Sequence, residues 1–415
     1  MPFILSQMLE FCRWAGALMV LSVHASNLFV SLKDIMDAPH APPVYVFWFF
    51  VAFELGHQAV ISFFVMSGYL VGGAVLRSIR QGKDFLREYL IHRFARIYVV
   101  TVPALVLTAL VDGFGRKLLP DPGVYASGLF REHFGLGIFL GNVANLQEIY
   151  VPCYGTNSPL WSLSCEFWYY ICFPLLAAPL ARNYSKALRV SAFALGLAIF
   201  LTLSFASGWF RFGFLLWVIG ALASLPTRPF IKSRWLAVAL YVAAVIPIRL
   251  LIRGPLLAAH PWLFEAGDLV GTLLFSNLML TVRHSPTQGW DLLRPAYHRR
   301  LADFSFSLYS VHMPVLFFLR ASADSFIRPT WAGELATPAH WAAFVGAVAT
   351  TLVVAYGFSR LTEAHTGDAR RYLNGLLPSF GPAPTHSPPP SPLSAPSVPA
   401  YASSRAPPRA SDAGP

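Results

Sequence analysis

Residues 13–25 read RWAGALMVLSVHA, an apolar run that begins at Arg13 and carries His24 near its end. The two residues lie eleven positions apart, about three turns of an α-helix, so both side chains project from one face. Their separation along the helix axis is about 16 Å, half the thickness of a membrane core. The run therefore predicts a membrane-spanning helix with a cation near one end and an imidazole deep inside.

The whole chain has the composition of a membrane protein. Of its 415 residues, 55% are hydrophobic and only 12% are charged, and the mean hydropathy is +0.53. Soluble domains carry about 25% charged residues, so this chain has too little polar surface to cover itself in water. Its apolar windows are continuous rather than alternating, which favours helices over a β-barrel. We expect an all-α fold, a polytopic membrane helical bundle.

About ten transmembrane helices are predicted from the apolar windows, at residues 9–30, 53–76, 94–112, 161–181, 188–206, 211–225, 236–253, 264–282, 302–320 and 341–360. With ten spans, sixteen Lys and Arg residues fall in the inner loops, which are 77–96, 182–189, 226–235 and 283–300. Positive charge in loops marks the cytoplasmic side, so both termini are expected to be cytoplasmic. A short, glycine-rich piece at 133–147 then becomes an outer re-entrant or surface segment.

The sequence divides into a membrane domain and a tail. Residues 1–365 form the membrane domain and 366–415 a cytoplasmic tail, which is rich in proline, serine and alanine from about residue 379 and is expected to be disordered. The net charge of +11 reflects the inner loops, and no basic run interleaved with aromatics suggests nucleic acid. The four cysteines lack metal-ligand spacing, so no metal site is expected.

Ionisable side chains in the first span need an explanation, because each costs a few kcal/mol inside a bilayer. Glu10 and Arg13 lie three residues apart and can pair near the cytoplasmic interface. Alternatively, Arg13 extends to the inner headgroups. His24 lies too deep to do so. It is either a neutral histidine bonded between helices or a functional group.

Two further stretches carry polar residues on the inner side. HRFARIY, residues 92–98, places Arg93 and Arg96 on one side of a helix, where they can grip a phosphate or simply anchor the cytoplasmic end. FFVMSGYLVGG, residues 63–73, places Gly68 and Gly72 four apart, which indicates close helix packing.

The outer side is marked by NSPLWSLSCEFWYYICFPLL, residues 157–176. Trp161 marks a helix start at the interface. Glu166 follows within two turns and can orient an imidazole, bind a hydroxyl-rich ligand, or pair with Arg211. In DFSFSLYSVHMPVL, residues 303–316, Tyr309 and His312 share one span with Pro314, which frees a backbone carbonyl.

Taken in order, these stretches resemble the acyltransferase-3 family of integral membrane acyltransferases, which includes O-antigen and exopolysaccharide O-acetylases. The resemblance runs over residues 9–365 and rests on six motifs: Arg13 with His24, FFVMSGYLVGG, Arg93 with Arg96, SPLWSLSCE, FSFSLYSVHMPV and FSRLTEAH. The chain departs from the family pattern after Glu166, where FWYY stands, and after Glu363, where Ala and His stand. The first departure concerns which acceptor is recognised, and the second concerns the role of Glu363.

The resemblance implies a cytoplasmic acyl-coenzyme A donor, with acetyl-CoA the expected one, and a carbohydrate acceptor such as a surface polysaccharide or a lipid-linked glycan. It also implies a multi-pass protein of the bacterial inner membrane, with the lipid bilayer as a partner. The acceptor can instead be a small hydroxylated metabolite or a lipid. A transporter or flippase is the alternative from another class, but the internal repeats typical of many transporters are absent from the sequence.

A mechanism follows from joining the motifs. Arg13, Arg93 and Arg96 are predicted to hold the phosphates of the donor, and its thioester is predicted to lie near His24. His24 is the predicted general base, and Glu166 is predicted to orient it or to position the acceptor. The predicted supporting residues are Glu10, Ser67, Trp161, Tyr309 and His312. Direct transfer and an acyl-histidine intermediate both remain open.

Overall fold

The computed structural model describes residues 2–29, 55–119, 125, 132–252, 259–285, 295–328, 331 and 337–376. Within these ranges the chain is helical and forms no strand apart from one bridge between Gln147 and Val151. The all-α prediction is therefore confirmed. Most of the tail predicted to be disordered, from residue 377 on, lies outside the described residues.

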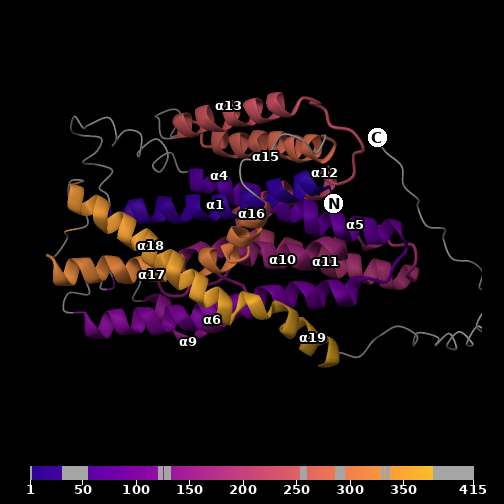
Figure 1. The fold of residues 1–415 in the computed structure, drawn as a ribbon. Coiled ribbons are helices and arrows are strands. Elements are labelled where there is room, and N and C mark those ends of the chain that lie inside the picture. Colours follow the sequence, from indigo (N-terminus) through magenta and orange to yellow (C-terminus); the bar gives the residue numbers. More distant parts are fainter. Residues whose placement is uncertain are drawn as a thin grey trace, which may run out of the picture. The chain divides into compact units, whose positions relative to one another are not determined.

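Figure 1 shows most of the helices running side by side. The first group comprises α1 (Phe3–Phe29), α4 (Leu55–Ser67), η2 (Gly68–Gly72), α5 (Gly73–Arg80), α6 (Leu86–Leu118), η3 (Glu132–Phe134), α9 (Leu136–Val143), η4 (Ser158–Leu160) and α10 (Trp161–Leu176). The second comprises η5 (Ala178–Leu180), α11 (Lys186–Ala206), α12 (Gly208–Ala223), α13 (Arg234–Ile252), α15 (Trp262–Arg283), α16 (Pro295–Ala302), α17 (Ser305–Phe326), α18 (Pro338–Leu361), η7 (Glu363–His365) and α19 (Thr366–Leu376).

Each of the ten predicted spans falls on one of these helices or on one continuous run of them. In the described part of the chain, seven helices are long and apolar enough to cross a membrane. The helices α16 and α17 meet at a bend of 46° and give an eighth spanning segment if they are counted as one. The helices α12 and α13 are apolar but shorter over their described stretches. The piece at 133–147, predicted to be a surface or re-entrant segment, contains the short helix α9.

The loops predicted to face the cytoplasm gather at one end of the bundle. The Tyr184 hydroxyl donates to Asp84 at 2.7 Å, and Arg283 donates to the carbonyl of Ser224 at 3.0 Å. Burial and the bond to Asp84 raise the pKa of Tyr184 to about 12, so this phenol stays a protonated donor at neutral pH. At the same end, Arg87 donates to the side chain of Asn374 at 3.1 Å.

Close packing of α4 and η2 on α12 fixes the middle of the bundle. A Cβ added at Gly68 would lie 1.9 Å from the carbonyl oxygen of Trp217, and one at Gly72 would lie 2.5 Å from the Cβ of Ala221. Only glycine fits at such distances, so the predicted packing role of the two glycines is confirmed. The turn η2 is π-helical, a local widening that often accompanies functional sites.

Candidate active site

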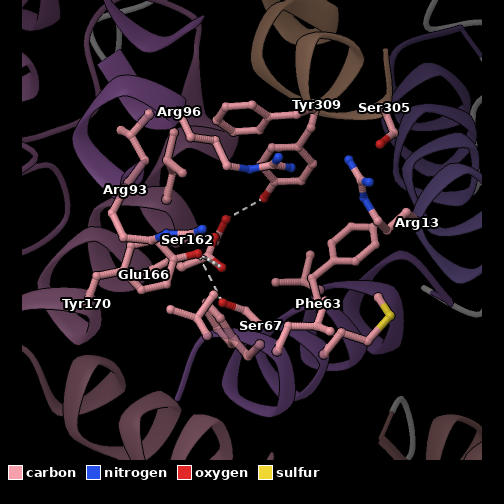
Figure 2. Close-up of a pocket in the computed structure, with 18 of the residues that line it drawn as sticks. Arg13, Phe63, Ser67, Arg93, Arg96, Ser162, Glu166, Tyr170, Ser305 and Tyr309 are labelled. Atoms are coloured by element: carbon pink, nitrogen blue, oxygen red, sulfur yellow. Dashed lines mark hydrogen bonds between the residues drawn. The ribbon is translucent and has the colours of Figure 1, made fainter. Parts of the chain in front are cut away.

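A cavity of about 400 Å³, called the inner cavity below, opens between α1, α4, α6, α10 and α17. Arg13, Arg93 and Arg96 all line it, although they come from two helices far apart in the sequence. Figure 2 shows the three guanidiniums and Glu166 around the same space. The structure thus brings together the three predicted donor-binding arginines.

The positive charge of this cavity lacks a direct counter-charge. Among the residues described, no carboxylate lies within 4.0 Å of the guanidinium of Arg13, Arg93 or Arg96. Arg93 lies over the ring of Tyr170 at 5.7 Å, and its buried Nε has no hydrogen-bond partner. An unpaired buried guanidinium is costly, so this cavity is suited to an anionic ligand.

A chain of hydrogen bonds crosses the floor of the inner cavity. The indole of Trp217 donates to the Ser67 hydroxyl at 3.1 Å, which lies 3.0 Å from the Tyr170 hydroxyl. Tyr170 in turn donates to Glu166 at 2.5 Å. Because an indole can only donate and Tyr170 has a single proton, Ser67 must donate to Tyr170. The chain therefore points every proton toward the Glu166 carboxylate.

A second space of about 330 Å³, called the outer cavity below, is lined by His24 and Asn27 from α1, His57 from α4, and Trp161 from α10. Val60 and Tyr309 line both cavities. The two cavities therefore lie in series along the bundle. The side chains of Val60 and Tyr309 form the wall between the two cavities.

His24 is held by His312 across α1 and α17. The Nδ1 atom of His24 lies 2.8 Å from Nε2 of His312. On its other side, Nδ1 of His312 lies 3.1 Å and 2.8 Å from the carbonyl oxygens of Leu308 and Tyr309. Carbonyls only accept, so Nδ1 of His312 carries the proton and its Nε2 accepts from His24. This assignment leaves Nε2 of His24 as a lone-pair nitrogen.

The predicted free carbonyl near Pro314 has a definite partner. Proline lacks an N–H, so the carbonyl of Ser310, four residues earlier, has no helical donor. The side chain of Asn157 donates to it at 2.9 Å. Asn157 directly precedes η4, whose Pro159 carbonyl accepts from the Tyr309 hydroxyl at 3.0 Å. The Ser310 carbonyl left free by Pro314 thus anchors the start of α10 to α17, near His312.

Comparison with known proteins identifies the chain's family. Residues 7–360 match the family described as an acyltransferase domain. The chain belongs to the acyltransferase-3 family. One relative is the acyltransferase MdmB of Streptomyces mycarofaciens, 30% identical over 122 residues, which are 29% of this chain and 28% of that protein. Another is an uncharacterised protein of Haemophilus influenzae, 29% identical over 127 residues, which are 28% of this chain and 46% of the relative.

The chain therefore matches less than half the length of either curated relative. No solved structure matches it. Membership of the acyltransferase-3 family, together with the apolar helices, makes this a multi-pass membrane protein of an acyltransferase family.

Two predicted pairings are wrong in this acyltransferase-3 protein. Glu166 does not orient His24, because its carboxylate lines the inner cavity and accepts from Tyr170, whereas the partner of His24 is His312. The pairing of Glu10 with Arg13 is not formed either: within the described ranges no ion pair under 4.0 Å joins them. Arg13 reaches into the inner cavity instead.

Other contributions to the site escaped prediction. Glu363 accepts from the backbone N–H and the hydroxyl of Ser307, at 3.1 Å and 2.8 Å, and so ties η7 to α17. Asp268 is fully buried on α15 and bonds to His57 at 2.8 Å. The available signal was the carboxylate of Asp268 within the apolar run AGDLVGTLLF, since such a group needs a partner inside a membrane.

Proposed function

We propose that the protein transfers an acyl group, acetyl in the simplest case, from cytoplasmic acyl-coenzyme A to a hydroxyl of a carbohydrate acceptor. The supporting observation is the arrangement of two cavities in series. One holds three guanidiniums without an ion pair to any described carboxylate, and the other holds a lone-pair imidazole nitrogen. The proposal includes ten spans, both termini in the cytoplasm, and a bacterial inner membrane.

The inner cavity is suited to the donor. Coenzyme A carries phosphates on its nucleotide and a thin pantetheine arm that ends in the thioester. Arg13, Arg93 and Arg96 supply charge and bidentate donors for the phosphates. The amide N–H groups of the arm are donors, and Glu166 at the end of its hydrogen-bond chain is an acceptor for them. We therefore assign Glu166 to donor binding.

The thioester must then reach His24, about 16 Å from Arg13 along α1 by helix rise. Val60 and Tyr309 stand between the cavities. The Tyr309 hydroxyl lies 2.6 Å from the Ser162 hydroxyl and donates to the Pro159 carbonyl at 3.0 Å. In the proposed reaction, Tyr309 swings away when the acyl arm arrives, and the two cavities become one.

The chemical step uses the lone pair of His24. As Nε2 takes the proton of the acceptor hydroxyl, the oxygen attacks the thioester carbonyl and a C–O bond forms. The C–S bond then breaks, and the coenzyme A thiolate leaves and takes up a proton from the His24 imidazolium. General base catalysis of this kind contributes about 10²- to 10⁴-fold. His312 is a positioning residue, because it acts through His24.

The test uses the full chain in lipid nanodiscs with radiolabelled acetyl-CoA and methyl glucoside as the acceptor probe. The expected result is coenzyme A release coupled to acetylated glycoside. It is abolished by His24→Ala and weakened by Arg93→Gln with Arg96→Gln. His284→Gln and Arg182→Gln, which lie outside both cavities, serve as matched controls. A wild-type rate in His24→Ala would show that His24 is not the general base.

Other acceptors are distinguished in the same assay. Octanol in place of methyl glucoside represents a lipid-like acceptor, and a macrocyclic alcohol represents a small hydroxylated metabolite. Preferential acetylation of octanol or of the macrocyclic alcohol would replace the carbohydrate as the proposed acceptor and leave the proposed mechanism unchanged. Binding of acetyl-CoA with no transfer to any probe would favour the transporter alternative.

A further inference from the structure

The outer cavity contains a second imidazole that the proposed chemistry does not use. His57, near the start of α4, lines this cavity together with His24. Its ring is fixed from two sides, since its centroid lies 4.8 Å from that of Phe264 and 5.9 Å from that of Trp209. The ring is therefore held in place rather than free to rotate.

A buried carboxylate determines which nitrogen of His57 is available. Asp268, with 0% exposure, accepts from the side chain of Gln58 at 2.9 Å and lies 2.8 Å from Nε2 of His57. Because Gln58 takes one carboxylate oxygen, the other is left to the ring, whose Nε2 carries the proton. The second ring nitrogen, Nδ1, has no protein partner among the described residues.

The position of His57 along α4 places it on the acceptor side. Val60 lines both cavities, and Ser67 lines the inner one. His57 lies three residues from Val60 in the direction away from Ser67, about 4.5 Å farther out by helix rise. A donor that comes from the arginines meets Val60 and Tyr309 before it meets His57.

Close contact of α4 with α1 keeps both imidazoles at one cavity. A Cβ added at Gly56 would lie 3.4 Å from the Cα of Val20 and from a methyl group of Val23. Gly56 thus lets the start of α4 approach α1 beside His24. The ring of Trp161 supplies an apolar wall to the same space.

We propose that His57, fixed by Asp268, binds a second hydroxyl of the acceptor while His24 engages the reacting hydroxyl. The outer cavity then selects molecules with two neighbouring hydroxyl groups over simple alcohols. Each hydroxyl meets one imidazole nitrogen that has no partner within the described ranges. This inference rests on the proposed function, because it presupposes acyl transfer at His24.

The experiment compares two probes that share one ring, trans-1,2-cyclohexanediol and cyclohexanol, with acetyl-CoA as the donor and the full chain in nanodiscs. One hydrogen bond changes affinity by about ten-fold, so wild-type kcat/KM is expected to favour the diol by about that factor or more. In His57→Gln the ratio of kcat/KM for the diol to kcat/KM for cyclohexanol is expected to fall to about two. This is the statistical value for a molecule with two equivalent hydroxyls. The loss is expected in KM for the diol, with KM for acetyl-CoA unchanged.

Asp268→Asn is the second variant and is expected to lower the ratio in the same direction, because it releases the His57 ring. His284→Gln, at the C-terminal cap of the helix that carries Asp268 and outside the cavity, should leave the ratio unchanged. Size-exclusion profiles show whether each variant is folded.

The proposal is overturned by a wild-type ratio near two, by a ratio that survives His57→Gln, or by acylation of neither probe. A wild-type protein that binds no acetyl-CoA would contradict the proposed donor instead, so the two failures are distinguishable.

Discussion

His24 and His312 face each other across two helices, with 2.8 Å between their nitrogens and ring planes only 4° from parallel. The backbone carbonyls of Leu308 and Tyr309 fix the proton on the far nitrogen of His312. These carbonyls thus fix the tautomer of His312. Because His312 then accepts from Nδ1 of His24, the lone pair of His24 lies on its Nε2.

The first prediction concerns this pair. His312→Ala is expected to lower kcat by about 10- to 100-fold, less than the loss of about 10²- to 10⁴-fold in His24→Ala, because it frees the His24 ring without removing it. His312→Gln, which can still accept from His24, should recover part of the activity. Steady-state kinetics with saturating acetyl-CoA measure the effect. Equal rates in the two His312 variants would contradict a positioning role.

The second prediction concerns donor binding. Arg93→Gln is expected to raise KM for acetyl-CoA by about 10- to 100-fold, because hydrogen bonds between charged groups contribute about 1.5–3 kcal/mol. KM for the acceptor should not change. Isothermal titration with acetyl-CoA and with dephospho-coenzyme A measures the loss directly. Unchanged affinity in Arg93→Gln, with Arg182→Gln as control, would exclude this arginine from the donor site.

The third prediction concerns the wall between the cavities. Tyr309→Phe removes the hydroxyl that bonds to Ser162 and Pro159 and should loosen the wall. We expect faster coenzyme A release from acetyl-CoA in the absence of acceptor, because water gains access to the thioester. A thiol-reactive dye follows the release. A rate equal to wild type would mean that these bonds do not hold the wall closed.

The fourth prediction concerns folding. Gly68→Ala should sharply reduce the yield of folded protein, because its Cβ would lie 1.9 Å from the Trp217 carbonyl oxygen and backbone would have to move. Gly113→Ala is the matched control, since its Cβ would meet nothing within 4 Å. An alanine in a helix is favoured over glycine by about 1 kcal/mol. Thermal unfolding in detergent compares the two, and equal stability would contradict the packing role of Gly68.

The sequence predicts the positions of the helices well, because each requires only a local run of apolar residues. The convergence of Arg13 with Arg93 and Arg96 was also predictable, since all three lie near the predicted cytoplasmic ends of the spans expected at 9–30 and 94–112. Pairings between helices are different, because they depend on how the helices rotate about their axes. For this reason the partner of His24 was missed, and Glu166 was given to the wrong cavity.

His57 shows a second limit of sequence reasoning. A single histidine near the end of an apolar run is unremarkable in composition and has no local partner. Its significance comes from Asp268, which lies 211 residues later in the chain. Only the packing of α4 on α15 turns the two into one unit.

The wall of Val60 and Tyr309 has a consequence for the cell. A closed wall at this point would interrupt the water path between the two cavities, and protons and small ions would then not flow down their gradients through this part of the bundle. If the proposed reaction takes place here, such a wall would allow acceptors on one side of the bilayer to be acylated by a donor from the other side without loss of the membrane potential.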